Sequence, residues 1–140
     1  EGARGRLLLA PPGGTTVVHV DDVALGHLLA LRRGRPGRRY VLGGDHLSYV
    51  TLFRLINEAV GRRGPLGTLP PSLLRFGGRW ADRLRRLGLP IPFSEGLAVA
   101  GNAHLYYDSN RARSELGYRP RPAVEAIREA VAWYRDRGLI

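Results

Sequence analysis

The chain contains no cysteine and no lysine. The absence of cysteine excludes disulfides, zinc fingers, iron–sulfur clusters and thiol catalysis. The absence of lysine excludes a P-loop, in which a lysine binds the phosphates of the nucleotide. No apolar run approaches the roughly 20 residues of a membrane-spanning helix, and no signal peptide opens the chain, so we expect a cytoplasmic protein.

The remaining composition is typical of a globular protein. The 140 residues suit one domain, 44% of them are hydrophobic, and 19 glycines with 10 prolines predict many turns. The first residue is Glu1 rather than methionine, so we expect residues 1–140 to be one part of a longer protein.

The chain is strongly basic, with a formal net charge of +10. Such a charge raises nucleic acid or an anionic ligand as a partner. All 22 basic residues are arginine, and ten of them gather at 32–39, at 62–63 and at 83–86. Because these segments are expected in loops or on the solvent side of helices, we favour a solvated surface over a nucleic-acid interface.

The apolar pattern predicts alternating strands and helices. Strands are expected at 15–20, 40–42, 66–69 and 104–107, and helices at 23–33, 49–60, 70–87, 95–100, 109–116 and 123–137. Asp21 or Asp22 is expected to cap the first helix, Ser48 the second, and Gly61 to follow the second helix as its C′ residue. The alternation indicates an α/β fold with parallel strands. Since the strands are few and short, they resemble the end of a larger sheet.

Candidate catalytic and binding residues are scarce. His19, Asp21 and Asp22 lie close enough for a metal site, but a capped helix with a hydrogen-bonded His19 explains them better. No Gly-x-Ser-x-Gly motif is present to supply a serine nucleophile. The glycine pairs at 13–14 and 43–44 lack the spacing of a dinucleotide fingerprint and are interpreted as turns. We therefore assign no catalytic, cofactor-binding or metal-binding residue.

Several sequence passages, in order along nearly the whole chain, are similar to one known family of proteins. They are residues 17–24 (VVHVDDVA), 40–44 (YVLGG), 108–112 (DSNRA), 115–120 (ELGYRP) and 130–134 (AVAWY). Together they resemble the extended short-chain dehydrogenase/reductases, also called the NAD-dependent epimerase/dehydratase family. The passages are most similar to the branch of hopanoid-associated sugar epimerases and dihydroflavonol-reductase-like members.

The resemblance implies an α/β fold consisting of the carboxyl-terminal portion of a Rossmann-like parallel sheet plus a small helical substrate lobe. NAD or NADP would be bound mainly by an amino-terminal part that precedes residue 1, and that part would be the partner of this chain. The family's Tyr-x-x-x-Lys pair cannot exist here, because the chain has no lysine, so we expect no turnover by the chain alone. A homodimer is a further partner that the resemblance allows.

The resemblance also bears on the substrate, a small molecule. Nucleotide-sugar members carry Arg-Asp at the positions of Thr15 and Thr16 and Arg-x-Gly-Asp near residues 101–104, and neither matches here. A less charged ketone or aldehyde is therefore as well supported as a nucleotide sugar. The residues chosen to line the substrate pocket are Thr16, His19 and His104.

Two other functions remain open from the sequence. The first is a small arginine-rich nucleic-acid-binding domain, whose affinity would fall steeply with salt. The second is a ligand-binding module that stands alone without a catalytic half. The leading hypothesis is the substrate-binding part of an NAD(P)-dependent sugar epimerase, dehydratase or ketone/aldehyde reductase.

Overall fold

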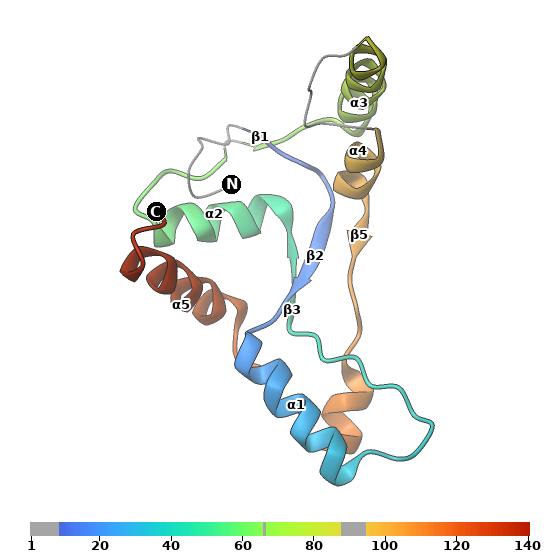
Figure 1. The fold of residues 1–140 in the computed structure, drawn as a ribbon, viewed down its shortest axis with the longest axis vertical. Helices are drawn as coiled ribbons and strands as arrows, with labels where there is room; N and C mark the ends of the chain where they lie inside the picture. The colour runs from blue at the N-terminus through green and yellow to red at the C-terminus, as the bar shows by residue number, and fades with distance from the viewer. Residues whose placement is uncertain (1–8, 66, 88–94) are drawn as a thin grey trace.

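The computed structural model describes residues 9–65, 67–87 and 95–140, which form an elongated mixed α/β structure (Figure 1). The strands are β1 (Leu9–Ala10), β2 (Gly14–Val17), β3 (Asp45–Ser48), β4 (Gly67–Thr68) and β5 (His104–Leu105). The helices are α1 (Val20–Arg33), α2 (Tyr49–Ala59), α3 (Pro71–Arg86), α4 (Glu95–Asn102), the π-helical segment Ala112–Leu116 and α5 (Ala123–Asp136). The α/β prediction is confirmed, and five of the six expected helices begin within two residues of their predicted starts or caps.

The strands form two small sheets, one parallel and one mixed. β2 is the central strand of a three-stranded sheet, antiparallel to β3 and parallel to β5, while β1 pairs with β4 in parallel. The expectation of parallel pairing therefore holds for β1–β4 and β2–β5 and is wrong for β2–β3. In β2, Thr15, Thr16 and Val17 are only half-buried.

The strand predicted at 40–42 is not formed, and β3 lies three residues further along the chain. Tyr40 and Leu42 instead pack against the buried cluster of Ala112, Leu116 and Tyr118. Their apolar character therefore reflects packing against this cluster rather than membership of a sheet. The predicted strand at 66–69 corresponds to β4, and its first residue, Leu66, lies outside the described residues.

Two helix starts show how local residues set the boundaries. Ser48 caps α2 as predicted, accepting a hydrogen bond from the N–H of Thr51, and Gly61 follows that helix with a φ of +76°. In α1, however, the cap is His19, whose ring accepts from the N–H of Asp21. The prediction of an aspartate cap is wrong, because both aspartates lie inside the first turn, where their charge favours the positive helix end.

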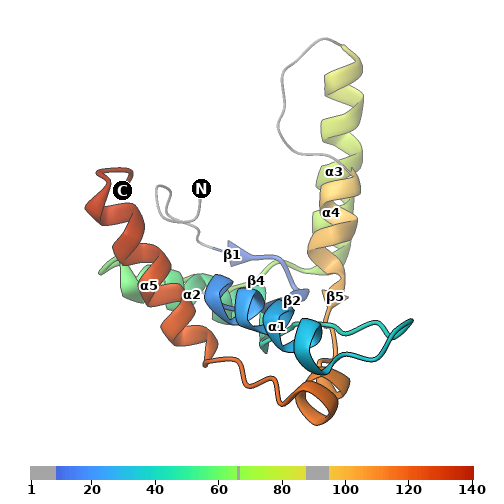
Figure 2. The ribbon, with the colours of Figure 1, turned by 60° about the horizontal axis from the view of Figure 1, so that its bottom comes forward.

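The packed regions are distributed along the molecule. The cluster around Leu116 joins the Ala112–Leu116 segment to α1, while α2 packs against α5. α3 and α4 lie side by side at the opposite end from α1 (Figure 2). In α3, Leu74 is buried whereas Leu73 and Trp80 are exposed.

Among the described residues, no helix combines the length and the apolar character needed to cross a bilayer.

Candidate functional site

A cluster of hydrogen-bonding and aromatic side chains lies on the three-stranded sheet, centred on Thr16. Thr16 in β2 lies opposite His46 in β3, and its Oγ1 is 3.0 Å from His46 Nδ1. The same oxygen accepts a hydrogen bond from the N–H of Tyr107 at 2.9 Å, which ties it to the chain after β5. Thr16 is thus held by both neighbouring strands.

Two further rings extend this cluster across the sheet. The ring of Tyr106 stacks on His46 with a centroid distance of 4.9 Å and meets the edge of His104 at 5.5 Å. We call Thr16, His46, His104 and Tyr106 the ring cluster. His46, His104 and Tyr106 are exposed, so their polar atoms are accessible to a small molecule. The cluster can donate and accept hydrogen bonds and stack on a planar group.

The structure therefore brings two of the three predicted pocket residues, Thr16 and His104, into one cluster. Sequence reasoning missed His46 and Tyr106, since their place opposite Thr16 and beside His104 depends on strand register. Whether the ring cluster binds substrate stays a prediction.

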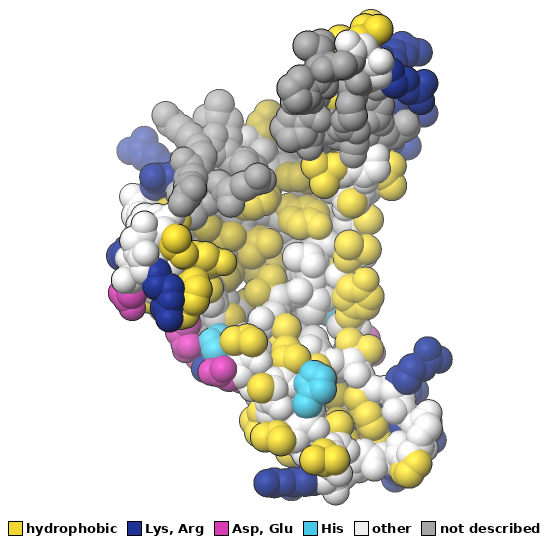
Figure 3. Space-filling view, in the orientation of Figure 1, with side chains coloured by type: hydrophobic (Ala, Val, Ile, Leu, Met, Phe, Trp, Pro, Cys, Tyr) yellow, Lys and Arg dark blue, Asp and Glu magenta, His cyan; other side chains and the backbone are white. Residues whose placement is uncertain are grey.

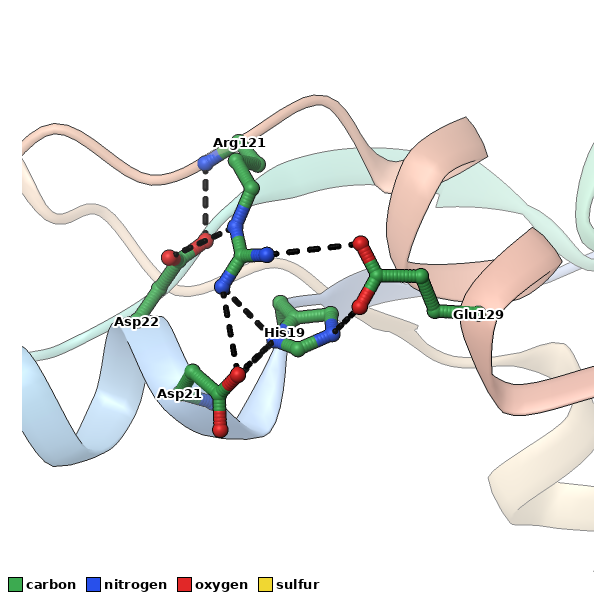
Figure 4. A network of polar contacts seen from close by, with 5 residues as sticks. All are labelled: His19, Asp21, Asp22, Arg121 and Glu129. Atoms are coloured by element: carbon green, nitrogen blue, oxygen red, sulfur yellow. Dashed lines mark hydrogen bonds and ion pairs between the residues drawn. The ribbon is translucent and has the colours of Figure 1, made fainter. Parts of the chain in front are cut away.

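His19, the third predicted residue, lies in a different place, in a polar network that joins α1 to α5 (Figure 4). The side chain is buried, its Nδ1 accepts from the N–H of Asp21, and its Nε2 lies 2.8 Å from Glu129 Oε2. Because Nδ1 accepts a hydrogen bond, the ring proton lies on Nε2, which donates a hydrogen bond to Glu129. Both ring nitrogens are thus used in the interior of the protein, although His19 also borders a groove of about 570 Å³ with Asp21, Trp133 and Tyr134.

Arg121 connects the same network to Asp22. The carboxylate of Asp22 is only 6% exposed and accepts from the backbone N–H of Arg121 at 2.8 Å and from its Nε at 3.0 Å. Glu129 accepts from Arg121 Nη1 at 3.4 Å. Across the described ranges, no group of three or more His, Asp or Glu side chains is arranged to hold a metal ion. The hydrogen bonds of the network link α1, α5 and the segment before α5.

Asp22 makes this link sensitive to pH. Burial alone would raise the pKa of its carboxyl group, but the hydrogen bonds from the backbone and guanidinium of Arg121 outweigh burial and lower the pKa below 3.8. A carboxyl group with a lowered pKa contributes stability that is present above the unfolded pKa and is lost as the pH falls through the folded pKa.

We therefore expect Asp22→Asn to be less stable than the wild type at pH 7 and this difference to shrink below about pH 4. Urea unfolding of both proteins between pH 7 and pH 3 measures the difference. Asp21→Asn is the matched control, because the neighbouring carboxylate is exposed and forms only long ion pairs of 3.7 Å. A difference for Asp22→Asn that stays constant down to pH 3 would contradict the assigned ion pair.

The glycine pairs test whether the described residues can hold a dinucleotide. The N–H groups of Gly13 and Gly14 donate to the carbonyls of Gly101 and Ala103, so they are not available to a phosphate. A Cβ on Gly44 would overlap the carbonyl oxygen of Val17. Gly13, Gly14 and Gly44 therefore allow chain segments to approach closely, which corrects their interpretation as turns. The backbone N–H groups of Gly13 and Gly14 therefore do not fit the diphosphate of NAD or NADP.

The sequence of the chain is similar to those of several known proteins. The chain is 33% identical over 99% of its length to sterol demethylase protein B of Methylococcus capsulatus and 32% identical over 91% to a putative dihydroflavonol 4-reductase of Synechocystis. It is 32% identical over 84% to a dTDP-glucose 4,6-dehydratase of Actinoplanes. No family model matches the chain.

Comparison with solved structures also finds a match along nearly the whole chain. The crystal structure of gox2253 matches 99% of the chain with a TM-score of 0.79 and 35% identity. The chain spans 43% of the Methylococcus protein, 38% of the Synechocystis protein and 42% of the gox2253 chain. These are α/β proteins of the reductase and dehydratase class. The chain belongs to the extended short-chain dehydrogenase/reductase family, over a segment that covers less than half of these relatives.

Proposed function

We propose that the chain is the substrate-binding, carboxyl-terminal part of an NAD(P)-dependent reductase, dehydratase or epimerase and is not catalytic by itself. The observation that carries the proposal is the similarity to extended short-chain dehydrogenases along 99% of this chain but only 43% of the relative. In this proposal NAD or NADP is bound mainly by an amino-terminal part. The glycine amides that are already hydrogen-bonded in this chain support that division.

An uncharged carbonyl compound is the substrate class that we favour. The ring cluster offers hydroxyl, imidazole and phenol groups, which suit a ketone or aldehyde oxygen and a planar or apolar body. One relative, from Stigmatella aurantiaca, is a ketoreductase of a farnesyl-bearing dihydroquinoline oxide and is 28% identical over 83% of the chain. Together with the sterol and dihydroflavonol names of the other relatives, this supports a carbonyl or hydroxyl group on a bulky apolar molecule.

The proposal is tested by reading the coding DNA upstream of Glu1 in frame and expressing the longer protein beside the 140-residue chain. We expect the longer frame to encode a Gly-x-x-Gly-x-x-Gly stretch and a Tyr-x-x-x-Lys pair. The longer protein should oxidise NADH or NADPH with a ketone or aldehyde panel, and the 140-residue chain should not. A longer frame without these motifs, or turnover by the short chain alone, would refute the proposal.

The ring cluster is tested in the longer protein with Thr16→Val. Loss of the hydroxyl, which hydrogen-bonds to His46 Nδ1 and so orients that ring, is expected to lower kcat/KM about tenfold while the Kd for the reduced cofactor stays unchanged. Thr68→Val, at an exposed position of β4, is the matched control and should leave both values unchanged. Wild-type kcat/KM in Thr16→Val would place the substrate elsewhere.

A further inference from the structure

Helix α3 is basic along its length. Arg75, Arg79, Arg83 and Arg86 recur at intervals of four, four and three residues, so they lie on one side of the helix. Asp82 is the one acidic residue in the sequence of the helix. The four arginines are exposed. This side of α3 therefore presents a row of positive charge to the surroundings.

Beside the arginine row, α3 exposes a stripe of large apolar side chains. Leu73, Phe76 and Trp80 are spaced by three and four residues and share one face. Phe76 is 60% exposed and Trp80 is 48% exposed, and their ring centroids are 6.1 Å apart. The stripe is separate from the side that packs against α4, where Leu74 and Ala81 are buried. α3 thus has a packed apolar side and, next to it, an exposed one.

The two rows adjoin each other at the end of the molecule. The guanidinium of Arg83 lies 5.6 Å from the centre of the Trp80 ring. Figure 3 shows basic side chains beside hydrophobic ones at the α3 end, which in Figures 1 and 2 projects away from the sheet and from α5. A flat surface could therefore approach α3 without contact with the Thr16 sheet.

We propose that α3 binds the surface of an anionic lipid bilayer, with Leu73, Phe76 and Trp80 inserted below the headgroups and the arginines on the lipid phosphates. A helix with exposed Trp, Phe and Leu beside a row of basic residues is suited to the bilayer interface. The positive charge of the arginine row favours an anionic bilayer over a second copy of the chain. A second copy would bring a like-charged arginine row to the same face, and nucleic acid would satisfy the arginines while leaving the apolar stripe in water.

The test is flotation of the 140-residue chain with vesicles. We expect binding to vesicles that contain phosphatidylglycerol and little binding to pure phosphatidylcholine. Arg75→Gln with Arg79→Gln should lower the partition coefficient about 25-fold, since each basic residue near an anionic surface contributes about fivefold. Phe76→Ser with Trp80→Ser should abolish flotation with the vesicles. In the wild type, insertion of Trp80 is measured as quenching of tryptophan fluorescence by brominated lipid.

Matched variants keep the test specific. Arg35→Gln with Arg38→Gln removes the same charge from the exposed loop after α1, and Leu28→Ser with Leu31→Ser removes exposed leucines from α1. Both controls should bind vesicles like the wild type, and far-UV circular dichroism should show that every variant is folded.

Three outcomes would overturn the lipid proposal. They are equal loss of binding in the α1 and α3 variants, a dimer that Phe76→Ser with Trp80→Ser dissociates without any vesicle binding, and salt-sensitive binding of DNA that needs the arginines but not the rings. None of these outcomes bears on the reductase proposal, which is tested by turnover of the longer protein.

Discussion

Leu116→Ala is expected to lower the free energy of unfolding by about 3 kcal/mol, because it removes a fully buried side chain and leaves a cavity. Leu116 packs with Ala112 and Tyr118, and this cluster in turn contacts Leu29 and Leu42. The cluster joins α1 to the chain segment that follows β5, so its loss weakens a contact between distant parts of the sequence. Urea unfolding at pH 7 measures the effect through the midpoint at constant slope.

Leu28→Ala is the matched control for this substitution. Leu28 lies on α1 and is 53% exposed, so its truncation should cost less than about 1 kcal/mol. Equal losses for the two variants would show that Leu116 is not in a packed interior.

Gly13→Ala is expected to lower the free energy of unfolding by about 3 kcal/mol through a steric conflict. An added Cβ would overlap the carbonyl oxygen of Ala103 and lie 2.7 Å from that of Gly101. Both obstacles are backbone atoms, which cannot rotate away as a side chain would. The N–H of Gly13 also donates to Gly101 at 2.9 Å, so separation of the two segments would break this hydrogen bond.

Gly67→Ala controls for the general effect of replacing glycine in a strand. Among the described residues, Leu9 Cδ2, at 3.9 Å, is the one atom within 4 Å of a Cβ added to Gly67 in β4, so alanine is accommodated there. We expect its stability to lie within about 1 kcal/mol of the wild type. A Gly13→Ala protein as stable as Gly67→Ala would mean that the close approach at Gly13 is not formed.

The helices were predictable because their signals are local. Ser48 and Gly61 bound α2 by hydrogen bonding and backbone conformation within a few residues, and the apolar repeat of α5 needs no distant partner. Strand pairing depends instead on segments far apart in the sequence. The residues 40–42 resemble a strand in composition, yet the side chains of Tyr40 and Leu42 pack against the Leu116 cluster. The strand that pairs with β2 is instead β3.

The residues of the candidate site likewise divide into those that local sequence patterns indicate and those that depend on strand pairing. Thr16 and His104 could be selected as polar residues beside predicted strands, but their neighbours His46 and Tyr106 follow only from the register of β2 with β3 and β5. His19 was predicted to line the pocket together with Thr16 and His104. Its ring instead caps α1 and binds Glu129, a residue on α5 that no local pattern connects with it.

The position of β2 between β3 and β5 has a consequence for how the protein forms on the ribosome. β3 lies next to β2 along the chain order of strands, whereas Leu105, the partner of Thr15 in β5, is synthesised far later. Until then, one edge of β2 is left without its hydrogen-bond partner, and closing the long intervening loop carries an entropic cost that local pairs do not. The nascent chain therefore passes through an interval in which this edge is open to pairing with other chains. Chaperones would shorten that exposure, and slow translation across residues 60–105 would lengthen it.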